Sequence, residues 1–187
     1  SSNENSSCVL VIDPADEPQR LLARIGDRKV SAVLLTHGHF DHVMGVDEIR
    51  NQAGVSVYLG EHEEKLISNA DLNVSAMFGT PYTTKADVLV KDGEVLELAG
   101  MKIKVIHTPG HTCGGVCYYL EDEGILICGD TLFLESVGRT DFPTSSPKQM
   151  KESLKRLLNE LPGETVVCPG HGEQTSIAYE KRYNPFA

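Results

Sequence analysis

The segment "THGHFDH" at residues 36–42 constrains this chain more than any other part of its sequence. It overlaps the end of the apolar run "VSAVLLT" at 30–36, which predicts a buried β-strand. Side chains alternate between the two faces of a strand, so the four polar residues cannot all face one way on a strand. We therefore place them on a loop that leaves the strand, where they can converge: His37, His39, Asp41 and His42.

Three further residues follow the same rule, because each lies just after an apolar strand and a glycine. His111 follows "VIHTPG", Asp130 follows "GILICG" and His171 follows "TVVCPG". Strand ends are rigid supports for a coordination geometry. Imidazole and carboxylate ligands together favour zinc, iron or manganese over calcium or magnesium. Seven ligands exceed one tetrahedral site and suit two metal ions that share a bridging carboxylate and a bridging water.

Two other histidines are interpreted differently, since a single histidine is more often a core or surface residue than a ligand. His62 in "EHEEK" is assigned to a solvated helix. His107 in "IHTPGH" ends a strand, and we favour a supporting or structural role for it over ligation.

Composition limits the class of protein and its partners. The 187 residues suit one domain, 1–187, and can bury a core. The net charge of −10 argues against binding to a phosphate backbone. No apolar run approaches the length of a membrane span, so no membrane partner is expected. The five cysteines are odd in number and widely spaced, which favours free thiols in a reducing, cytoplasmic compartment. The oligomeric state is left open.

The remaining pattern mixes β-hairpins with strand–helix units. Apolar faces predict helices around Leu21–Ile25, Val43–Ile49 and Met150–Leu161, the last with Ser146 as its N-cap and Pro147 in its first turn. Residues 69–86 and 131–147 are expected to be loops. Strands are expected at 8–13, 30–36, 55–59 and 165–168, with hairpins at 94–108 and 114–129. This mixture favours two sheets with helices outside over a purely parallel doubly wound sheet.

The motifs "THGHFDH", "HTPGHT", "CGDTLF", "GRTDF" and "PGHG" resemble those of the metallo-β-lactamase-fold hydrolases, in order along nearly the whole chain. The resemblance implies an α/β fold, a four-layer αββα sandwich of two mixed β-sheets with the metals at one edge. It also implies how the ligands divide: His37, His39 and His111 for one metal, Asp41, His42 and His171 for the other, and Asp130 as the bridge.

Single residues separate the branches of this superfamily. The common zinc β-lactamases carry Cys where this chain has Asp130, and Cys128 is expected to face the core. The flavo-diiron branch carries Glu at the position of His39, and the RNA-processing nucleases insert a further domain. The chain looks most like the short bacterial glyoxalase II-like group of hydroxyacylglutathione hydrolases, including its ending "YEKRYNPF".

Two departures from that group are visible. We expect no C-terminal helical extension of the kind that contacts glutathione in full-length glyoxalase II. Only "SSNENSS" precedes the strand at "CVLVID", so we expect an edge strand to be missing or replaced.

These features predict a metal-dependent hydrolase that cleaves a thioester such as S-lactoylglutathione by attack of a metal-bridging hydroxide. Asp41 and Asp130 are the expected catalytic carboxylates. With two divalent ions, most simply Zn²⁺ but also Fe or Mn, the site carries roughly +1 charge, which favours a small anionic thioester. Arg139 either meets a substrate carboxylate or forms a structural pair, for instance with Asp141.

Two other enzymatic interpretations stay open, together with a non-catalytic one. A persulfide dioxygenase of the same fold would use one iron, held here by His37, His111 and Asp130. A hydrolase of another small ester or lactone would use the same ligands. A metal-binding domain without catalysis would need a broken ligand set, and this set looks complete.

Overall fold

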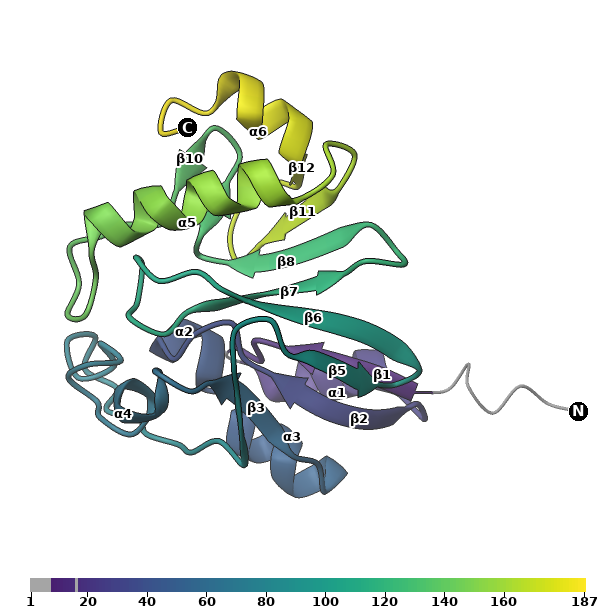
Figure 1. Cartoon of the computed structure of the whole chain (residues 1–187). Helices are drawn as coiled ribbons and strands as arrows, with labels where there is room; N and C mark the ends of the chain where they lie inside the picture. The colour runs from purple at the N-terminus through teal and green to yellow at the C-terminus, as the bar shows by residue number, and fades with distance from the viewer. Residues whose placement is uncertain (1–7, 16) are drawn as a thin grey trace, which may run out of the picture.

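A computed structural model describes residues 8–15 and 17–187 (Figure 1). The first sheet has the strand order β1-β2-β3-β4, and each pair of neighbours in it is parallel. Helices connect its successive strands, as parallel pairing requires. The strands are β1 (Cys8–Ile12), β2 (Lys29–Leu34), β3 (Val57–Gly60) and β4 (Val88–Val90).

The second sheet is mixed and has the order β12-β11-β8-β7-β6-β5. The two expected hairpins form the part from β8 to the edge strand β5, while β11 pairs in parallel with β8. A separate two-stranded ribbon joins β9 to β10. These strands are β5 (Val95–Leu98), β6 (Met101–His107), β7 (Val116–Leu120), β8 (Ile125–Gly129), β9 (Leu132–Phe133), β10 (Ser136–Val137), β11 (Val166–Pro169) and β12 (Thr175–Ser176).

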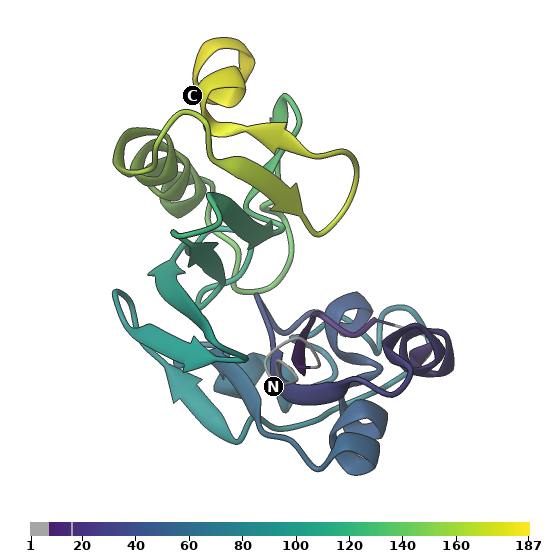
Figure 2. The same cartoon turned by 90° about the vertical axis from the view of Figure 1, so that its right-hand side faces the viewer.

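The helices cover the outer faces of the two sheets, and Figure 2 shows the purple-to-blue N-terminal half beside the green-to-yellow C-terminal half. One apolar cluster packs α1 and α3 against the first sheet, and a second packs α5 against the other sheet. A third fills the space between the sheets. The helices are α1 (Pro18–Ile25), α2 (Phe40–Val43), α3 (Val46–Ala53), α4 (Glu64–Ile67), α5 (Pro147–Glu160) and α6 (Ile177–Tyr183).

The expected αββα sandwich is therefore confirmed, with parallel pairs in its first sheet and mixed pairs in the second. The start of α5 is also confirmed, because Pro147 opens the helix and Ser146 Oγ accepts a hydrogen bond from the Gln149 amide. The expectation of an edge strand before β1 concerns residues 1–7, which lie outside the described residues.

Several short elements were not predicted. The segment 131–147 contains the β9–β10 ribbon, β4 lies at 88–90, and β12 and α6 follow the last expected strand. A strand of two or three residues is too short to carry a repeating pattern, so its pairing depends on tertiary contacts.

The two sheets meet along one edge, where β2, β8 and β11 all end. Across this edge the Tyr118 hydroxyl donates to the Leu35 carbonyl over 2.9 Å. The Val116 amide donates to the Thr36 carbonyl over 2.8 Å. These bonds fix the end of β2 against β7, so residues that follow β2 and β8 are brought to one place.

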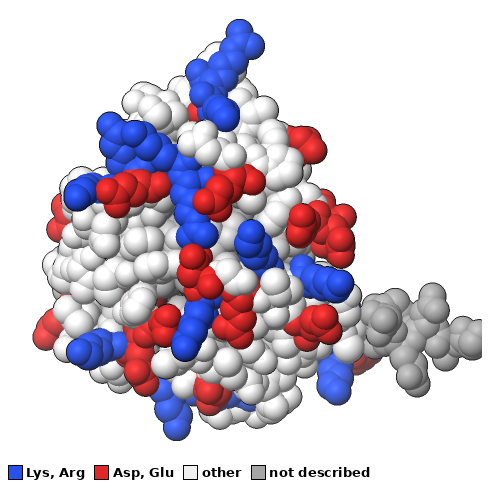
Figure 3. All heavy atoms as spheres, viewed as in Figure 1, with Lys and Arg blue, Asp and Glu red and all other residues white. Residues whose placement is uncertain are grey.

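In the part of the chain that the structure describes, no helix has the length and apolarity needed to cross a membrane. On the face drawn in Figure 3, the Lys and Arg side chains are interspersed with Asp and Glu and form no continuous basic surface. That face does not offer the clustered positive charge that a nucleic-acid backbone requires.

Candidate metal centre

The seven residues expected as metal ligands lie together at the edge where the sheets meet. His37 and His39 lie between β2 and α2, whereas Asp41 and His42 lie within α2. The other three follow strands β6, β8 and β11, and are His111, Asp130 and His171. Four of the histidines are buried, while the side chains of His171 and Asp41 are 57% and 42% exposed. The cluster therefore has a closed side and a side that opens to solvent.

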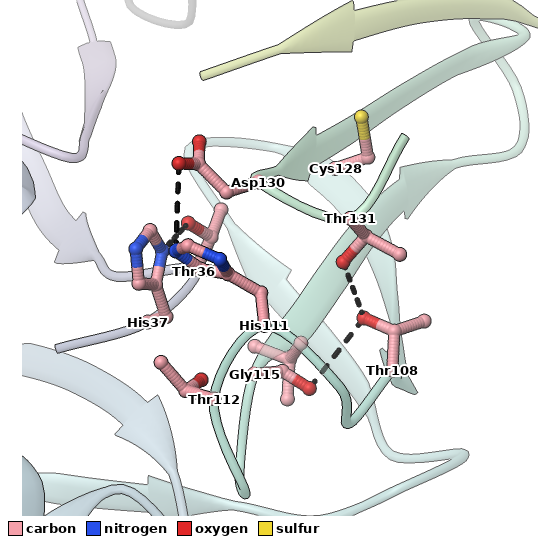
Figure 4. Close-up of a pocket in the computed structure, with 10 residues that line it drawn as sticks. Thr36, His37, Thr108, His111, Thr112, Gly115, Cys128, Asp130 and Thr131 are labelled. Carbon is pink, nitrogen blue, oxygen red and sulfur yellow. Dashed lines mark hydrogen bonds and ion pairs between the residues drawn. The ribbon is translucent and has the colours of Figure 1, made fainter. Parts of the chain in front are cut away.

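The carboxylate of Asp130 occupies the middle of the cluster. Its Oδ1 lies 3.5 Å from His42 Nε2, and its Oδ2 lies 3.5 Å from His111 Nε2 and 3.8 Å from His171 Nε2. Figure 4 shows this carboxylate directed at His111, with His37 alongside. Asp41 reaches only one side, with its Oδ2 at 3.2 Å from His171 Nε2 and 3.9 Å from His42 Nε2.

Gly129 allows the backbone to direct the Asp130 side chain toward the cluster. Strand β8 ends at Gly129, whose φ of 47° is favourable for glycine and strained for other residues. A Cβ at this position would also lie 2.2 Å from Thr36 Oγ1, so a side chain would collide with the end of β2. The backbone can therefore turn sharply there and present Asp130 beside the loop that carries His37.

Hydrogen bonds on the far side of the rings fix which nitrogen faces the cluster. The Thr36 hydroxyl donates to Asp13 Oδ2 over 2.6 Å, so its oxygen accepts from His37 Nδ1 over 3.1 Å. His42 Nδ1 donates to the same Asp13 oxygen over 3.0 Å. His111 Nδ1 donates to the Arg139 carbonyl over 2.8 Å. The rings of His37 and His42 thereby turn Nε2 toward the cluster, and His111 Nε2 lies 2.9 Å from His39 Nδ1 inside it.

The pKa values of the cluster histidines indicate that a positive charge is favoured beside the carboxylates. Burial, with smaller contributions from neighbouring histidines, lowers the pKa of His37 well below its ordinary value and that of His39 to about 3. Burial also lowers the pKa of His42, but the charges of Asp13, Asp130 and Asp41 outweigh it and raise that pKa to about 9. A proton on His42 thus occupies the position that a cation would take, since ligand binding requires the neutral ring.

The arrangement of unpartnered atoms fits metal ions. The buried atoms His37 Nε2, His39 Nε2, His42 Nε2 and Asp130 Oδ1 have no hydrogen-bond partner, although buried polar atoms are normally satisfied. Three groups of ligand atoms lie within 4.8 Å of one another: His37, His39 and His111; His37, His42 and Asp130; and Asp41, His42 and His171. Asp130 thus groups with His37 from the first of these groups and with His42 from the third. The division into two ions with Asp130 between them stays a prediction.

Other residues singled out in the sequence lie around this cluster. His62 is exposed, as expected, but it lies in the turn before α4 and not in a helix. His107 Nε2 donates to the Cys113 carbonyl over 3.3 Å. Cys128 faces the core, as expected. Arg139 lines a hollow of about 340 Å³ that opens onto the cluster. Its guanidinium bonds Asp141 through two contacts of 2.7 and 2.8 Å, which is the structural pair that the sequence left open.

Two supporting carboxylates were missed. Asp13 follows the apolar run of β1 and so obeyed the strand-end rule that identified the ligands. Glu63 gave no such signal, yet it is fully buried and burial raises its pKa. Its Oε2 accepts from the Gly38 amide over 2.9 Å, and its Oε1 accepts from the Gly114 amide over 2.7 Å. It thereby ties the loop of His37 and His39 to the loop of His111.

A comparison with known families identifies this arrangement. The pattern described as "Metallo-beta-lactamase superfamily" matches residues 4–171. The chain belongs to this superfamily. Membership agrees with the fold, with the His and Asp cluster of a two-metal centre, and with an enzyme of the hydrolase type.

Curated relatives from bacteria are similar over nearly the whole chain. The probable metallo-hydrolase YqgX of Bacillus subtilis is 36% identical, over 95% of this chain and 86% of that protein. The hydroxyacylglutathione hydrolase GloC of Haemophilus influenzae is 33% identical, over 94% of this chain and 85% of that protein.

Solved structures of the superfamily are similar in fold and sequence. BLEG-1 B3 metallo-beta-lactamase has a TM-score of 0.93 and 34% identity, covering 100% of this chain and 91% of that one. TTHA1623 in a di-iron-bound form has a TM-score of 0.85 and 41% identity, covering 94% of this chain and 88% of that one. ETHE1 from Myxococcus xanthus has a TM-score of 0.80 and 30% identity, covering 99% of this chain and 76% of that one.

The superfamily membership makes Asp13 testable as a supporting residue. We expect Asp13→Asn to weaken metal binding by about tenfold to a hundredfold, because an amide cannot accept all the bonds that fix His42 and Thr36. Asn tolerates the φ of 46° at this position, so the backbone should be kept. Competition with a chelator measures the affinity, and Asp27→Asn in an exposed turn is the control. Equal affinities in both variants would remove Asp13 from the metal centre.

Proposed function

We propose that this protein is a metal-dependent hydrolase that cleaves a small thioester. The observation that carries the proposal is the convergence of seven ligand residues at the mouth of one hollow. Five of those residues, His39, Asp41, His111, Asp130 and His171, also line the hollow of about 340 Å³. A carbonyl group bound in this hollow therefore lies next to the ligand cluster. When bound, a pair of divalent ions supplies hydroxide near neutral pH and polarises a carbonyl oxygen.

The two proposed catalytic carboxylates have different positions. Asp130 lies between the two ligand sets, with its Oδ1 buried and unpartnered. Asp41 lies on the open side, where its half-exposed carboxylate is within 3.2 Å of His171 Nε2. It is placed to accept the proton of an attacking water and to orient His171 at the same time.

The lining of the hollow suits a leaving group that needs no proton donor. Of the described residues that line it, none is a Lys, Tyr or Cys. An alkyl thiol has a pKa of about 8.5, so a thiolate departs more readily than an alkoxide or an amine. This favours a thioester over an ordinary ester or an amide. The name of the Haemophilus influenzae relative supports the same chemistry.

The second candidate is the persulfide dioxygenase that the sequence left open. The similarity to ETHE1, with 30% identity over 99% of this chain, is the observation that keeps this candidate. Such an enzyme would use the trio His37, His111 and Asp130. The nearby second set, Asp41, His42 and His171, favours the hydrolase, since one iron would leave these groups without a role.

One panel of assays tests these candidates on the purified protein with its metal content measured. The panel contains S-lactoylglutathione, a short lactoyl thioester, glutathione persulfide with oxygen consumption, and a chromogenic cephalosporin. The cephalosporin is included because of the similarity to BLEG-1. We expect turnover of the thioesters, abolished by a chelator and restored by divalent metal. Oxygen consumption without thioester turnover would replace the proposal by the dioxygenase, and dominant cephalosporin cleavage would replace it by a lactamase.

Little discrimination is expected between the two thioesters. Glutathione carries two carboxylates, whereas Arg139 is the single Lys or Arg among the described residues that line the hollow, and Asp141 already pairs with one edge of its guanidinium. Remote binding energy is therefore scarce. We expect kcat/KM for S-lactoylglutathione and the short thioester to differ by about tenfold or less, or ~1.4 kcal/mol. A ratio of a thousandfold would instead require a glutathione site elsewhere on the chain.

A further inference from the structure

The hollow beside the metal centre has an apolar wall next to its ligands. Phe40, Val74, Phe78 and Phe142 line it together with the ligand residues. The rings of Phe40 and Phe78 stack with centroids 4.8 Å apart and planes at 28°. The ring of Phe142 lies edge-on to His39, at 5.4 Å between centroids. An aromatic wall of this kind offers dispersion contacts to an apolar or flat group.

Phe78 is exposed although it is large and apolar. Its exposed fraction is 57%, and Met77 beside it is 68% exposed. An exposed apolar side chain that lines a hollow can contact a bound ligand there. Phe78 therefore has apolar surface available for a ligand, in direct continuity with the metal centre.

The loop that carries Phe78 is anchored by hydrogen bonds of Asn73. The Phe40 amide donates to the Asn73 carbonyl over 3.1 Å, and Asn73 Nδ2 donates to the Tyr82 carbonyl over 2.8 Å. Between these anchors, Val74 is 1% exposed and adopts a φ of 61°. A β-branched residue rarely adopts this conformation, and such strain persists where the surroundings impose it. The wall is therefore held in a defined position next to the ligands.

The cationic side of the hollow is largely neutralised. One edge of the Arg139 guanidinium, Nε and Nη2, is bonded to Asp141, and its Cζ lies 3.9 Å from the centre of the Phe142 ring. The Nη1–Nη2 edge of Arg139 can still bind a substrate carboxylate, but the negative charge of Asp141 beside it weakens that attraction. The other described lining residues that are not candidate ligands are apolar: Phe40, Val74, Phe78 and Phe142.

We propose that the wall of Phe40, Val74 and Phe78 is a subsite for an apolar group attached directly to the scissile thioester, on its acyl or its thiol side. This inference rests on the proposed function and names its substrate class: thioesters with an aromatic or branched aliphatic group next to the reacting carbonyl or sulphur. A phenyl group in place of methyl fills the space against Phe78, and this exchange gains about tenfold or more in binding.

The test measures binding of ketone analogues, in which CH₂ replaces the thioester sulphur so that no hydrolysis can occur. Butanone is compared with propiophenone, which has phenyl on the acyl side, and with phenylacetone, which has phenyl on the thiol side. Titration calorimetry or ligand-observed NMR gives the dissociation constants for the protein as purified. We expect at least one phenyl ketone to bind about tenfold more tightly than butanone, and the preferred isomer identifies which side faces the wall.

Two variants separate the wall from a general apolar effect. Phe78→Ala should abolish the preference for the phenyl ketone, whereas Met77→Ala, at a more exposed position outside the lining, should keep it. Melting curves check that both variants fold, as expected for exposed positions. Equal binding of all three ketones, or a preference that survives Phe78→Ala, overturns the subsite. Thioester hydrolysis with no phenyl preference overturns only the subsite, and phenyl preference without hydrolysis overturns only the proposed function.

Discussion

Asp130→Ala is expected to bind one equivalent of metal and to lose nearly all turnover. Among the described residues, Asp130 is the one carboxylate that approaches both ligand sets, at 3.5 Å from His42 and 3.5 Å from His111. Without it the two sets lack a shared anion, and two divalent ions would repel each other across the gap. Loss of several kcal/mol of transition-state stabilisation corresponds to a rate lower by about a thousandfold or more.

Metal content per chain and kcat for the preferred thioester measure this result. Asp122→Ala removes a carboxylate from the exposed β7–β8 turn and serves as the matched control. Asp130→Asn keeps the shape of the side chain and separates loss of charge from loss of packing. A variant at position 130 that retained two metal ions and a near-normal rate would contradict the bridging role.

The convergence of the seven candidate ligands was predictable because it obeys a simple relation between sequence and topology. Buried strands appear as short apolar runs, and the residues that follow them emerge at the strand ends. The parallel pairing of β8 and β11 brings Asp130 and His171 to one edge, and the register with β2 follows from contacts between the sheets. The motif resemblance then assigned the residues to one fold, which the structure confirms.

Features that depend on loop geometry were not predictable in this way. Glu63 reaches Gly38 and Gly114 only because α4 is folded against both loops, and "EHEEK" resembles any solvated segment. The stacking of Phe78 on Phe40 joins residues from a loop with weak periodicity to the start of α2. Asp13 could have been found, since it follows a strand. The "PADEP" segment after it suggested an ordinary turn instead.

A second large effect is expected from the smallest possible substitution, Gly170→Ala. A Cβ at this position would lie 2.4 Å from Asp130 Oδ1 and 2.7 Å from His42 Cε1, both closer than real Cβ contacts allow. The Gly170 amide also donates to the Gly129 carbonyl over 2.8 Å, so its backbone cannot easily withdraw. The added methyl group must therefore displace a proposed bridging carboxylate or a proposed ligand ring.

Displacing a reacting group by about 1 Å can cost a hundredfold in rate, so we expect kcat of Gly170→Ala to fall by about that factor or more. Gly172→Ala is the matched control on the other side of His171. It has a φ of 84°, which strains any side chain, but no atom lies within 4 Å of its added Cβ. If backbone strain alone mattered, Gly172→Ala would be the more damaged of the two. Because the collision with Asp130 and His42 occurs only at position 170, we expect metal content and kcat to fall there and to stay near normal at position 172.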